Sequence, residues 1–166
     1  MSQTDISHFD VHSSGHAPLE ARAPAHDAGP IPDADQSPLR ILIAEDNGVL
    51  RRLLALVLRR DGHDVIEACD VGELLEALGS SWIDGGEAPI DLVVCEQSLP
   101  GIAGLSVLAG LRSRDRLTPF ILMTGDEDVQ GRARRLGAVV LDHPFNIAAI
   151  RRAIRESAEL PHLMND

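Results

Sequence analysis

Short apolar runs alternate with helix-like segments along most of the chain, and this alternation restricts the fold more than any other feature. Residues 41–44 and 92–95 are unbroken apolar runs, which are typical of strands buried on both faces of a sheet. Three further strands are predicted at 63–68, 120–124 and 138–141. The polar members of 63–68 suit a sheet edge. The intervals between the runs are each long enough for a helical crossover.

A helix is predicted after each strand. In the first, four apolar residues recur at positions i, i+3, i+4 and i+7, arginines fall largely on the other side, and Asp61-Gly62 closes the helix. The four apolar residues are Leu50, Leu53, Leu54 and Val57. The other helices are predicted around 74–78, 105–111, 129–136 and 147–154. Five strands alternating with five helices predict an α/β fold, a doubly wound five-stranded parallel sheet with helices on both faces.

The chain divides into three parts by composition. Residues 1–38 hold five of the ten prolines and four of the seven histidines, with few large apolar side chains. Such a segment buries too little surface to offset the entropy of ordering it, so we predict a disordered N-terminal tail. The domain is expected at 39–158, followed by a short C-terminal tail at 159–166. Because so few residues follow the last predicted helix, we expect a domain that acts alone.

Charge and cysteine content narrow the class of protein. The chain has 166 residues and a formal net charge of −11, and all 15 of its strongly basic residues are arginines. An acidic chain without a basic run is a poor candidate for binding nucleic acid or an anionic membrane. No apolar stretch reaches membrane-spanning length, and the N-terminus lacks the basic and apolar regions of a secretory signal. Cys69 and Cys95 lie in apolar runs and indicate reduced, buried thiols, so we predict a cytoplasmic protein.

Polar residues follow the predicted strands at the points where the strands end. Glu45 and Asp46 come after the first strand, Glu96 ends the third, Thr124 ends the fourth and His143 follows the fifth. In an open parallel sheet, ligands bind at the carboxyl ends of the strands. Carboxylates are ligands that a hard cation such as Mg²⁺ prefers. The sequence therefore predicts an acidic site at this edge of the sheet.

The same segments resemble the receiver domains of two-component response regulators. Residues 41–47 resemble the opening strand and acidic pair of that family, and residues 91–101 resemble its phosphorylation segment. Residues 119–125 resemble the strand that ends in a threonine, and 143–145 the segment that normally reads Lys-Pro-Phe. Four separated motifs agree in order with the predicted strands. The resemblance implies a flavodoxin-like (βα)5 three-layer sandwich.

The resemblance also implies a metal site. In that family the acidic pair binds Mg²⁺, and an aspartate at the end of the third strand takes a phosphoryl group from a histidine kinase. The ligands that the resemblance implies here are Glu45, Asp46, Glu96 and a backbone carbonyl near Ser98. We expect this Mg²⁺ binding to be weak.

Three residues depart from the family pattern. Glu96 stands where the family has its phosphoacceptor aspartate, His143 where it has its lysine, and Val140 where it has its switching aromatic residue, while Thr124 is retained. Glutamate is one methylene longer than aspartate, and a misplacement of about 1 Å can slow a reaction on the order of 100-fold. Losing the lysine removes a cation that would stabilise the transferring oxygens. Phosphorylation and its readout are therefore both expected to be impaired.

The two substituted residues of the site leave several interpretations open. Glu96 is either a mimic of the phosphorylated state, an inert remnant or a working acceptor. His143 either shapes the turn before Pro144 or replaces the missing lysine as a cation, since nearby carboxylates favour an imidazolium.

The function expected from these residues is an atypical, non-enzymatic receiver domain. Its partner is expected to be a signalling protein, either a histidine kinase or a downstream effector, and a homodimer is compatible with the sequence. One alternative is a working receiver that uses Glu96 as its acceptor. The other is a binding module that responds to a metal or ligand through the acidic site.

Overall fold

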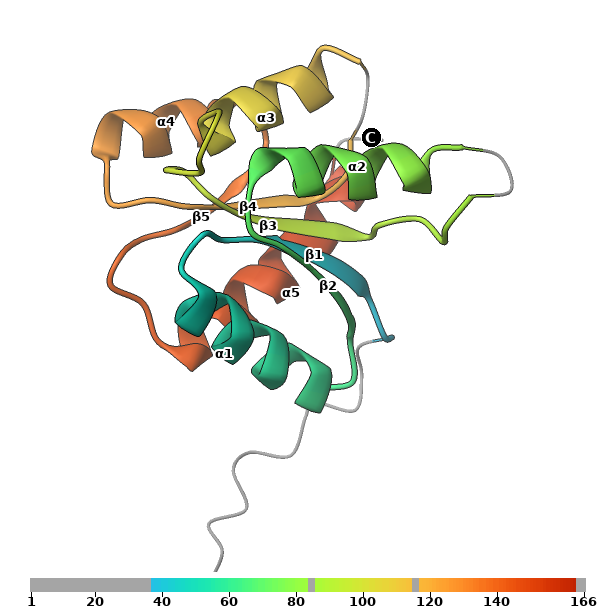
Figure 1. Cartoon of the computed structure of the whole chain (residues 1–166). Coiled ribbons are helices and arrows are strands. Elements are labelled where there is room, and N and C mark those ends of the chain that lie inside the picture. The colour runs from blue at the N-terminus through green and yellow to red at the C-terminus, as the bar shows by residue number, and fades with distance from the viewer. Residues whose placement is uncertain (1–36, 84–85, 115–116, 164–166) are drawn as a thin grey trace, which may run out of the picture. The chain divides into compact units, whose positions relative to one another are not determined.

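The protein forms one five-stranded parallel sheet in the computed structural model, which describes residues 37–83, 86–114 and 117–163 (Figure 1). The predicted tail lies outside the described residues except for its last two positions. The strand order is β2-β1-β3-β4-β5. The strands are β1 (Arg40–Ala44), β2 (Asp64–Ala68), β3 (Leu92–Glu96), β4 (Phe120–Met123) and β5 (Val139–Leu141). This order confirms the predicted fold, and β2 lies at an edge as its polar residues indicated.

A helix follows each strand, and the helices form the two outer layers of a three-layer sandwich. The helices are α1 (Gly48–Arg60), α2 (Val71–Ser81), α3 (Gly104–Arg112), α4 (Glu127–Arg135) and α5 (Ile147–Leu163). Helices α1 and α5 cover one face of the sheet, and α2, α3 and α4 cover the other (Figure 1). Among the helices of the described ranges, none combines the length and the apolar character that crossing a bilayer requires.

Alternate residues of each central strand supply the two cores. In β1, Ile41 and Ile43 pack with the helices of one face, whereas Leu42 and Ala44 pack with those of the other. All four are fully buried. Successive side chains of a strand point to opposite faces of the sheet, so a strand covered on both sides must be apolar at every position. This explains the unbroken apolar runs of the sequence.

The buried side of α1 differs from the prediction. Leu54 is buried as expected, together with Ala55 and Leu58, whereas Leu53 is 48% exposed. The helix carries apolar residues on more than one side, and periodicity alone does not show which side faces the sheet.

The last helix is longer than predicted. The apolar pattern ends at residue 154, but α5 continues to Leu163. Ser157 is fully buried, and its hydroxyl donates a hydrogen bond to the Ile154 carbonyl at 2.8 Å. The buried stripe thus continues through a small polar residue, which an apolar pattern does not detect. The predicted domain end at residue 158 lies inside this helix.

The prediction of two buried thiols is correct for Cys95 and wrong for Cys69, which is partly exposed. Cys69 follows the edge strand β2, and its backbone N–H donates to the Glu73 carboxylate at 2.8 Å. A residue at the end of an edge strand has neighbours on one side, so the apolar run around it is not fully covered.

Candidate functional site: the carboxyl edge of the sheet

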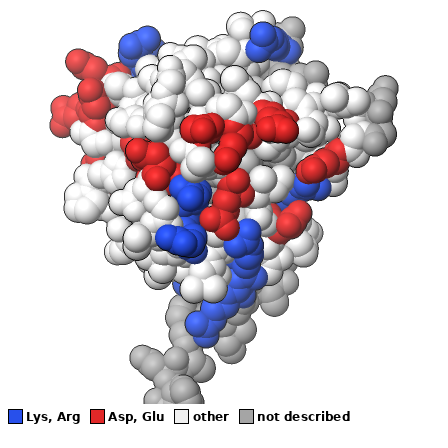
Figure 2. All heavy atoms as spheres, in the orientation of Figure 1, with Lys and Arg blue, Asp and Glu red and all other residues white. Residues whose placement is uncertain are grey.

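The carboxyl ends of β1, β3 and β4 meet at one edge of the sheet. Ala44 pairs with Cys95, and Glu96 pairs with Met123, so the residues that follow β1 and β4 lie beside the end of β3. Figure 2 shows acidic side chains gathered across the middle of the visible face, with basic side chains below them over α1. The structure therefore brings together the strand-end residues that the sequence placed at one edge.

Glu45 is the buried member of the acidic pair. Its side chain is 3% exposed, and its Oε1 accepts the Asn47 N–H at 2.9 Å. Its Oε2 is buried without a hydrogen-bond partner in the described part of the chain. Burial raises the pKa of this carboxyl, the hydrogen bond from the Asn47 N–H offsets part of the rise, and Glu96 and Asp46 add to it. Asp46 itself is exposed.

Glu96 has hydrogen-bond partners for both of its carboxylate oxygens. Its Oε2 lies 2.8 Å from His143 Nε2, and its Oε1 accepts the Ser98 N–H at 3.1 Å. The side chains of Glu96 and His143 are 14% and 36% exposed. The His143 ring also lies against Phe145, with ring centroids 5.2 Å apart. His143 therefore contacts the residue that stands in the acceptor position.

Thr124 is buried and is connected to α4 rather than to Glu96. Its Oγ1 accepts the N–H of Asp126, the residue that caps α4, at 3.2 Å. Its carbonyl accepts a hydrogen bond from Gln130 Nε2 at 3.2 Å, and the same amide donates to Asp142 at 3.0 Å. Gln130 thus holds the ends of β4 and β5 together. Val140 is half-buried in β5 and packs against the core beneath α3 and α4.

Two residues of this edge were not predicted from the sequence. Gln130 is a buried polar residue of α4, and the signal for it is its spacing of three residues from the buried Ala133. Arg51 was assigned to the outer side of α1, yet its Nη1 donates to the Glu45 carbonyl at 2.7 Å. Helical side chains lean toward the N-terminus of their helix, so an arginine one turn into α1 reaches back over the strand end.

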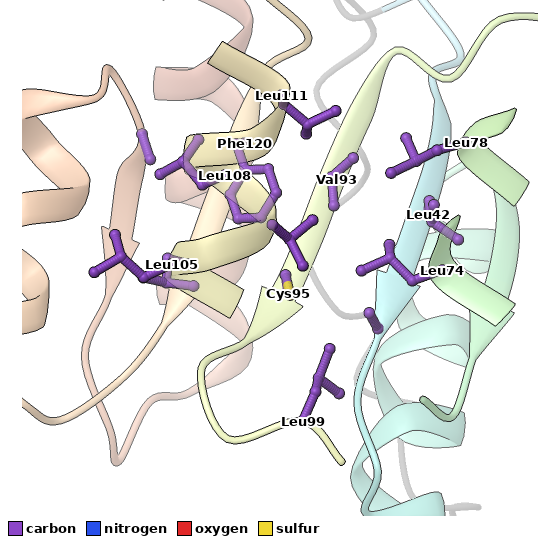
Figure 3. Packing of buried hydrophobic residues seen from close by; sticks show 14 of the residues in the cluster. Leu42, Leu74, Leu78, Val93, Cys95, Leu99, Leu105, Leu108, Leu111 and Phe120 are labelled. Carbon is purple, nitrogen blue, oxygen red and sulfur yellow. The ribbon is translucent and has the colours of Figure 1, made fainter. Parts of the chain in front are cut away.

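The core beneath the site packs tightly against the end of β3. The Cys95 side chain lies in the apolar cluster on this face of the sheet (Figure 3), and its Sγ lies 3.1 Å from the position that a Cβ at Gly104 would take. Burial raises the pKa of the Cys95 thiol, with smaller contributions from Glu96 and Glu45, so this cysteine remains a thiol. Gly104 begins α3 at a close approach to the carbonyl of Glu96.

Gly104→Ala is expected to destabilise the protein by about 1–3 kcal/mol, the usual cost of overpacking a core. A Cβ at Gly104 would lie 2.6 Å from the Glu96 carbonyl oxygen and 2.8 Å from Leu122 Cδ1. Gly110→Ala on the same helix is the matched control, because nothing lies within 4 Å of its Cβ position. The control is expected to stabilise by about 0.5–1 kcal/mol. Urea denaturation measures both changes, and equal effects would contradict the close approach.

The described residues offer an incomplete set of metal ligands. Across residues 37–83, 86–114 and 117–163, no group of three or more His, Cys, Asp or Glu side chains is arranged to hold a metal ion. Both oxygens of Glu96 are engaged, as described above. The buried, unpartnered Oε2 of Glu45 is the feature that fits a cation. Mg²⁺ binding therefore stays a prediction.

Comparison with known proteins supplies the family. The family model of the response regulator receiver domain matches residues 41–155, which are more than half of the chain. The chain belongs to the response regulator receiver domain family. The transcriptional regulatory protein PdtaR of Mycobacterium tuberculosis is 34% identical over 130 residues, covering 76% of this chain and 60% of that protein. The chain thus spans less than two thirds of that relative.

Solved receiver structures share the fold. The chemotaxis protein CheY4 of Vibrio cholerae has a TM-score of 0.62 at 19% identity and covers 73% of this chain and 99% of its own. The receiver domain of the hybrid histidine kinase CckA has a TM-score of 0.58 at 27% identity, covering 72% and 98%. Receiver domains are signalling modules of two-component systems, generally non-enzymatic, and they interact with histidine kinases or effectors. They typically bind Mg²⁺ at the acidic phosphorylation site.

Proposed function

We propose that this receiver domain is an atypical member that works by binding a signalling protein, either a histidine kinase or an effector, and takes up a phosphoryl group slowly or not at all. The observation that carries the proposal is the engagement of both Glu96 oxygens, by His143 at 2.8 Å and by the Ser98 N–H at 3.1 Å. A cytoplasmic location is part of the proposal.

The chemistry of phosphoryl transfer supports this proposal in two ways. An acceptor carboxylate must place an oxygen in line with the leaving group, and the contact at 2.8 Å orients the Oε2 of Glu96 toward the imidazole of His143. The transferring oxygens also need a fixed positive charge, which stabilises them most in a site that excludes water. The chain contains no lysine, and its His143 is already committed to Glu96.

The same geometry favours a mimic of the phosphorylated state over an inert remnant. The longer Glu96 side chain carries its carboxylate farther from β3 than an aspartate would, and there it contacts the residue in the place of the family's lysine. A carboxylate has less charge than an aspartyl phosphate, so this contact is a weaker version of the phosphorylated one.

Incubation of the full chain with acetyl phosphate and Mg²⁺, followed by intact-mass measurement, tests the proposal. We expect no species heavier by one phosphoryl group, while a conventional receiver domain treated in parallel gains one. A phosphoryl group mapped to Glu96 would instead establish the working-receiver alternative.

A second candidate function is a response to divalent cations through the acidic pair. Its support is the buried Oε2 of Glu45, which has no hydrogen-bond partner among the residues that the structure describes. Glu45 and Asp46 would hold a weakly bound Mg²⁺, and the cation would neutralise the carboxylates that face each other at this edge. The stability measurements on Glu45 in the Discussion test this candidate.

A further inference from the structure

Gln130 is a buried polar residue of α4 that the proposed function does not use. Both N–H groups and the oxygen of its amide are engaged. The Nε2 donates to the Thr124 carbonyl at 3.2 Å and to Asp142 Oδ1 at 3.0 Å, while the Oε1 accepts from Arg134 Nη2 at 3.2 Å. Since two partners accept and one donates, the surroundings allow a single orientation of the amide. The hydrogen bonds therefore fix the Gln130 side chain in place.

The contact with Asp142 bears on the site because Asp142 directly precedes His143 in the chain. The ladder between β4 and β5 ends where the Thr124 N–H donates to the Leu141 carbonyl at 3.1 Å. Beyond that point the chain leaves the sheet and runs to the start of α5. The hydrogen bond from Gln130 thus ties this connecting segment to α4 at the residue next to His143.

The backbone of His143 also lies against the segment that follows β4. A Cβ at Gly125 would lie 3.8 Å from the His143 carbonyl oxygen and 3.9 Å from His143 Cβ, which is ordinary van der Waals contact. From this position the ring reaches Glu96, with Nε2 at 2.8 Å from Oε2. Where the backbone of His143 is held decides what its ring can contact.

The contact between His143 and Glu96 needs this support because water reaches it. The His143 side chain is 36% exposed. A contact between ionisable side chains at the surface contributes little by itself, since water competes for both groups and the side chains lose entropy on pairing. Holding the backbone of one partner in place lowers the entropy that remains to be lost when the contact forms.

We propose that Gln130 is a positioning residue of this site, which acts through Asp142 to hold His143 against Glu96. The inference rests on the proposed function, because the contact it concerns is the one that would mimic the phosphorylated state. It adds a residue of α4 that keeps this contact formed. When the hydrogen bond to Asp142 is lost, the segment after β5 gains freedom, and the imidazole of His143 spends more time in solvent.

The rate at which diethyl pyrocarbonate modifies His143 in the full chain measures this freedom, because the reagent attacks an exposed, unprotonated imidazole nitrogen. Gln130→Met keeps the length of the side chain but loses the amide. His143 should then react about 5-fold faster at neutral pH, as expected for the loss of one hydrogen bond. Mass spectrometry of the His143 peptide gives the rate. His63 precedes β2 at the opposite edge of the sheet and is the internal reference, whose rate should not change.

Two further variants separate positioning from a general loosening of α4. Ala133→Gly is the matched control, because Ala133 is buried on the same helix and glycine weakens the helix without removing the hydrogen bond to Asp142. It should leave the rate at His143 unchanged. Asp142→Ala removes the same hydrogen bond from its exposed end, so it should raise the rate as Gln130→Met does, even if that variant folds poorly. Circular dichroism shows which variants fold.

A reversed hydrogen bond tests whether Asp142 is the intermediary. Gln130→Glu sets two carboxylates against each other and should speed the modification of His143. Adding Asp142→Asn supplies an amide that donates to the new carboxylate, so the rate should return toward that of the unmodified chain. Both of these variants lack the donor to the Thr124 carbonyl, so a return shows that the contact with Asp142 is the one that matters.

Four results would overturn the proposal. They are an unchanged rate at His143 in folded Asp142→Ala, an equal rise in Ala133→Gly, a rise that His63 shares, and no return in Gln130→Glu/Asp142→Asn. Phosphoryl uptake at Glu96 is measured separately, in the experiment with acetyl phosphate. A failure of the positioning role is therefore distinguishable from a failure of the proposed function.

Discussion

The Glu96→Asp/His143→Lys variant is expected to accept a phosphoryl group from acetyl phosphate at least about 100-fold faster than the unmodified chain. The aspartate withdraws the carboxylate by one methylene, which frees it from the position where it now meets His143 at 2.8 Å. The lysine supplies a fixed cation for the transferring oxygens. The acidic pair and Thr124 are retained for the remaining contacts. Intact-mass measurement at successive times after addition of acetyl phosphate and Mg²⁺ gives the rate.

Two further variants separate the contributions of the two substitutions to the faster phosphorylation. Glu96→Gln/His143→Lys keeps the new cation but has no acceptor, so it is the matched control and should gain no phosphoryl group. Glu96→Asp alone should react more slowly than the double variant, because it lacks the ammonium group that the lysine brings to the transferring oxygens. If the double variant is as inert as the unmodified chain, the two substitutions are not what limits phosphorylation.

The sheet was predictable from the sequence because its strands satisfy one simple requirement. A strand covered by helices on both faces must be apolar at every position, and Ile41–Ala44 and Leu92–Cys95 meet that requirement. The lower apolar content of Asp64–Ala68 likewise indicated its place at the edge. The strand-end residues followed directly, since parallel strands bring their carboxyl ends to one edge. Glu45, Glu96 and His143 were found in this way.

The helices were less predictable because burial there depends on contacts between distant residues. Leu53 and Leu54 are equally apolar, and the sheet decides which of them is buried. Gln130 and Ser157 are polar residues in buried positions, and each is satisfied by hydrogen bonds that no local pattern reveals. Arg51 is similar, because its contact with the Glu45 carbonyl depends on how α1 leaves the strand.

Glu45→Gln is expected to stabilise the metal-free protein at pH 7–8 by about 1–3 kcal/mol, the range for relieving a buried unsatisfied polar group. Glu45 is 3% exposed, and its Oε2 has no hydrogen-bond partner among the described residues. A glutamine keeps an oxygen for the Asn47 N–H and removes the charge. Its amide also becomes a donor near the carboxylates of Glu96 and Asp46, whose charges act on Glu45. Thermal unfolding in EDTA should show a gain of about 4 °C per kcal/mol.

The sign of the pH dependence follows from the raised pKa of Glu45 in the folded state. A carboxyl whose pKa is higher in the folded than in the unfolded protein contributes stability at low pH, and this contribution is lost as the pH rises through the folded pKa. The advantage of Glu45→Gln should therefore be largest at pH 7–8 and shrink toward pH 3, which lies below the unfolded value of about 4.3, where the carboxyl is protonated in both states. Glu76→Gln is the matched control, because Glu76 is exposed on α2 and is not among the groups that act on Glu45. An advantage that is constant from pH 4 to pH 8 would show that charge burial is not its cause.

Mg²⁺ should also reduce the difference in stability between Glu45→Gln and the unmodified chain, because it should stabilise the unmodified chain. A cation at the acidic pair binds the folded state, and at ten times its dissociation constant it stabilises by about 1.4 kcal/mol. The unmodified chain should gain this stability as Mg²⁺ is added at pH 7–8, whereas Glu45→Gln, which lacks the buried charge, should gain much less. Because the proton and the cation neutralise the same carboxylate oxygen, the Mg²⁺ effect should also fade as the pH is lowered. A Mg²⁺ effect of equal size in both proteins would place the cation elsewhere and remove the support for a metal-responsive site at Glu45.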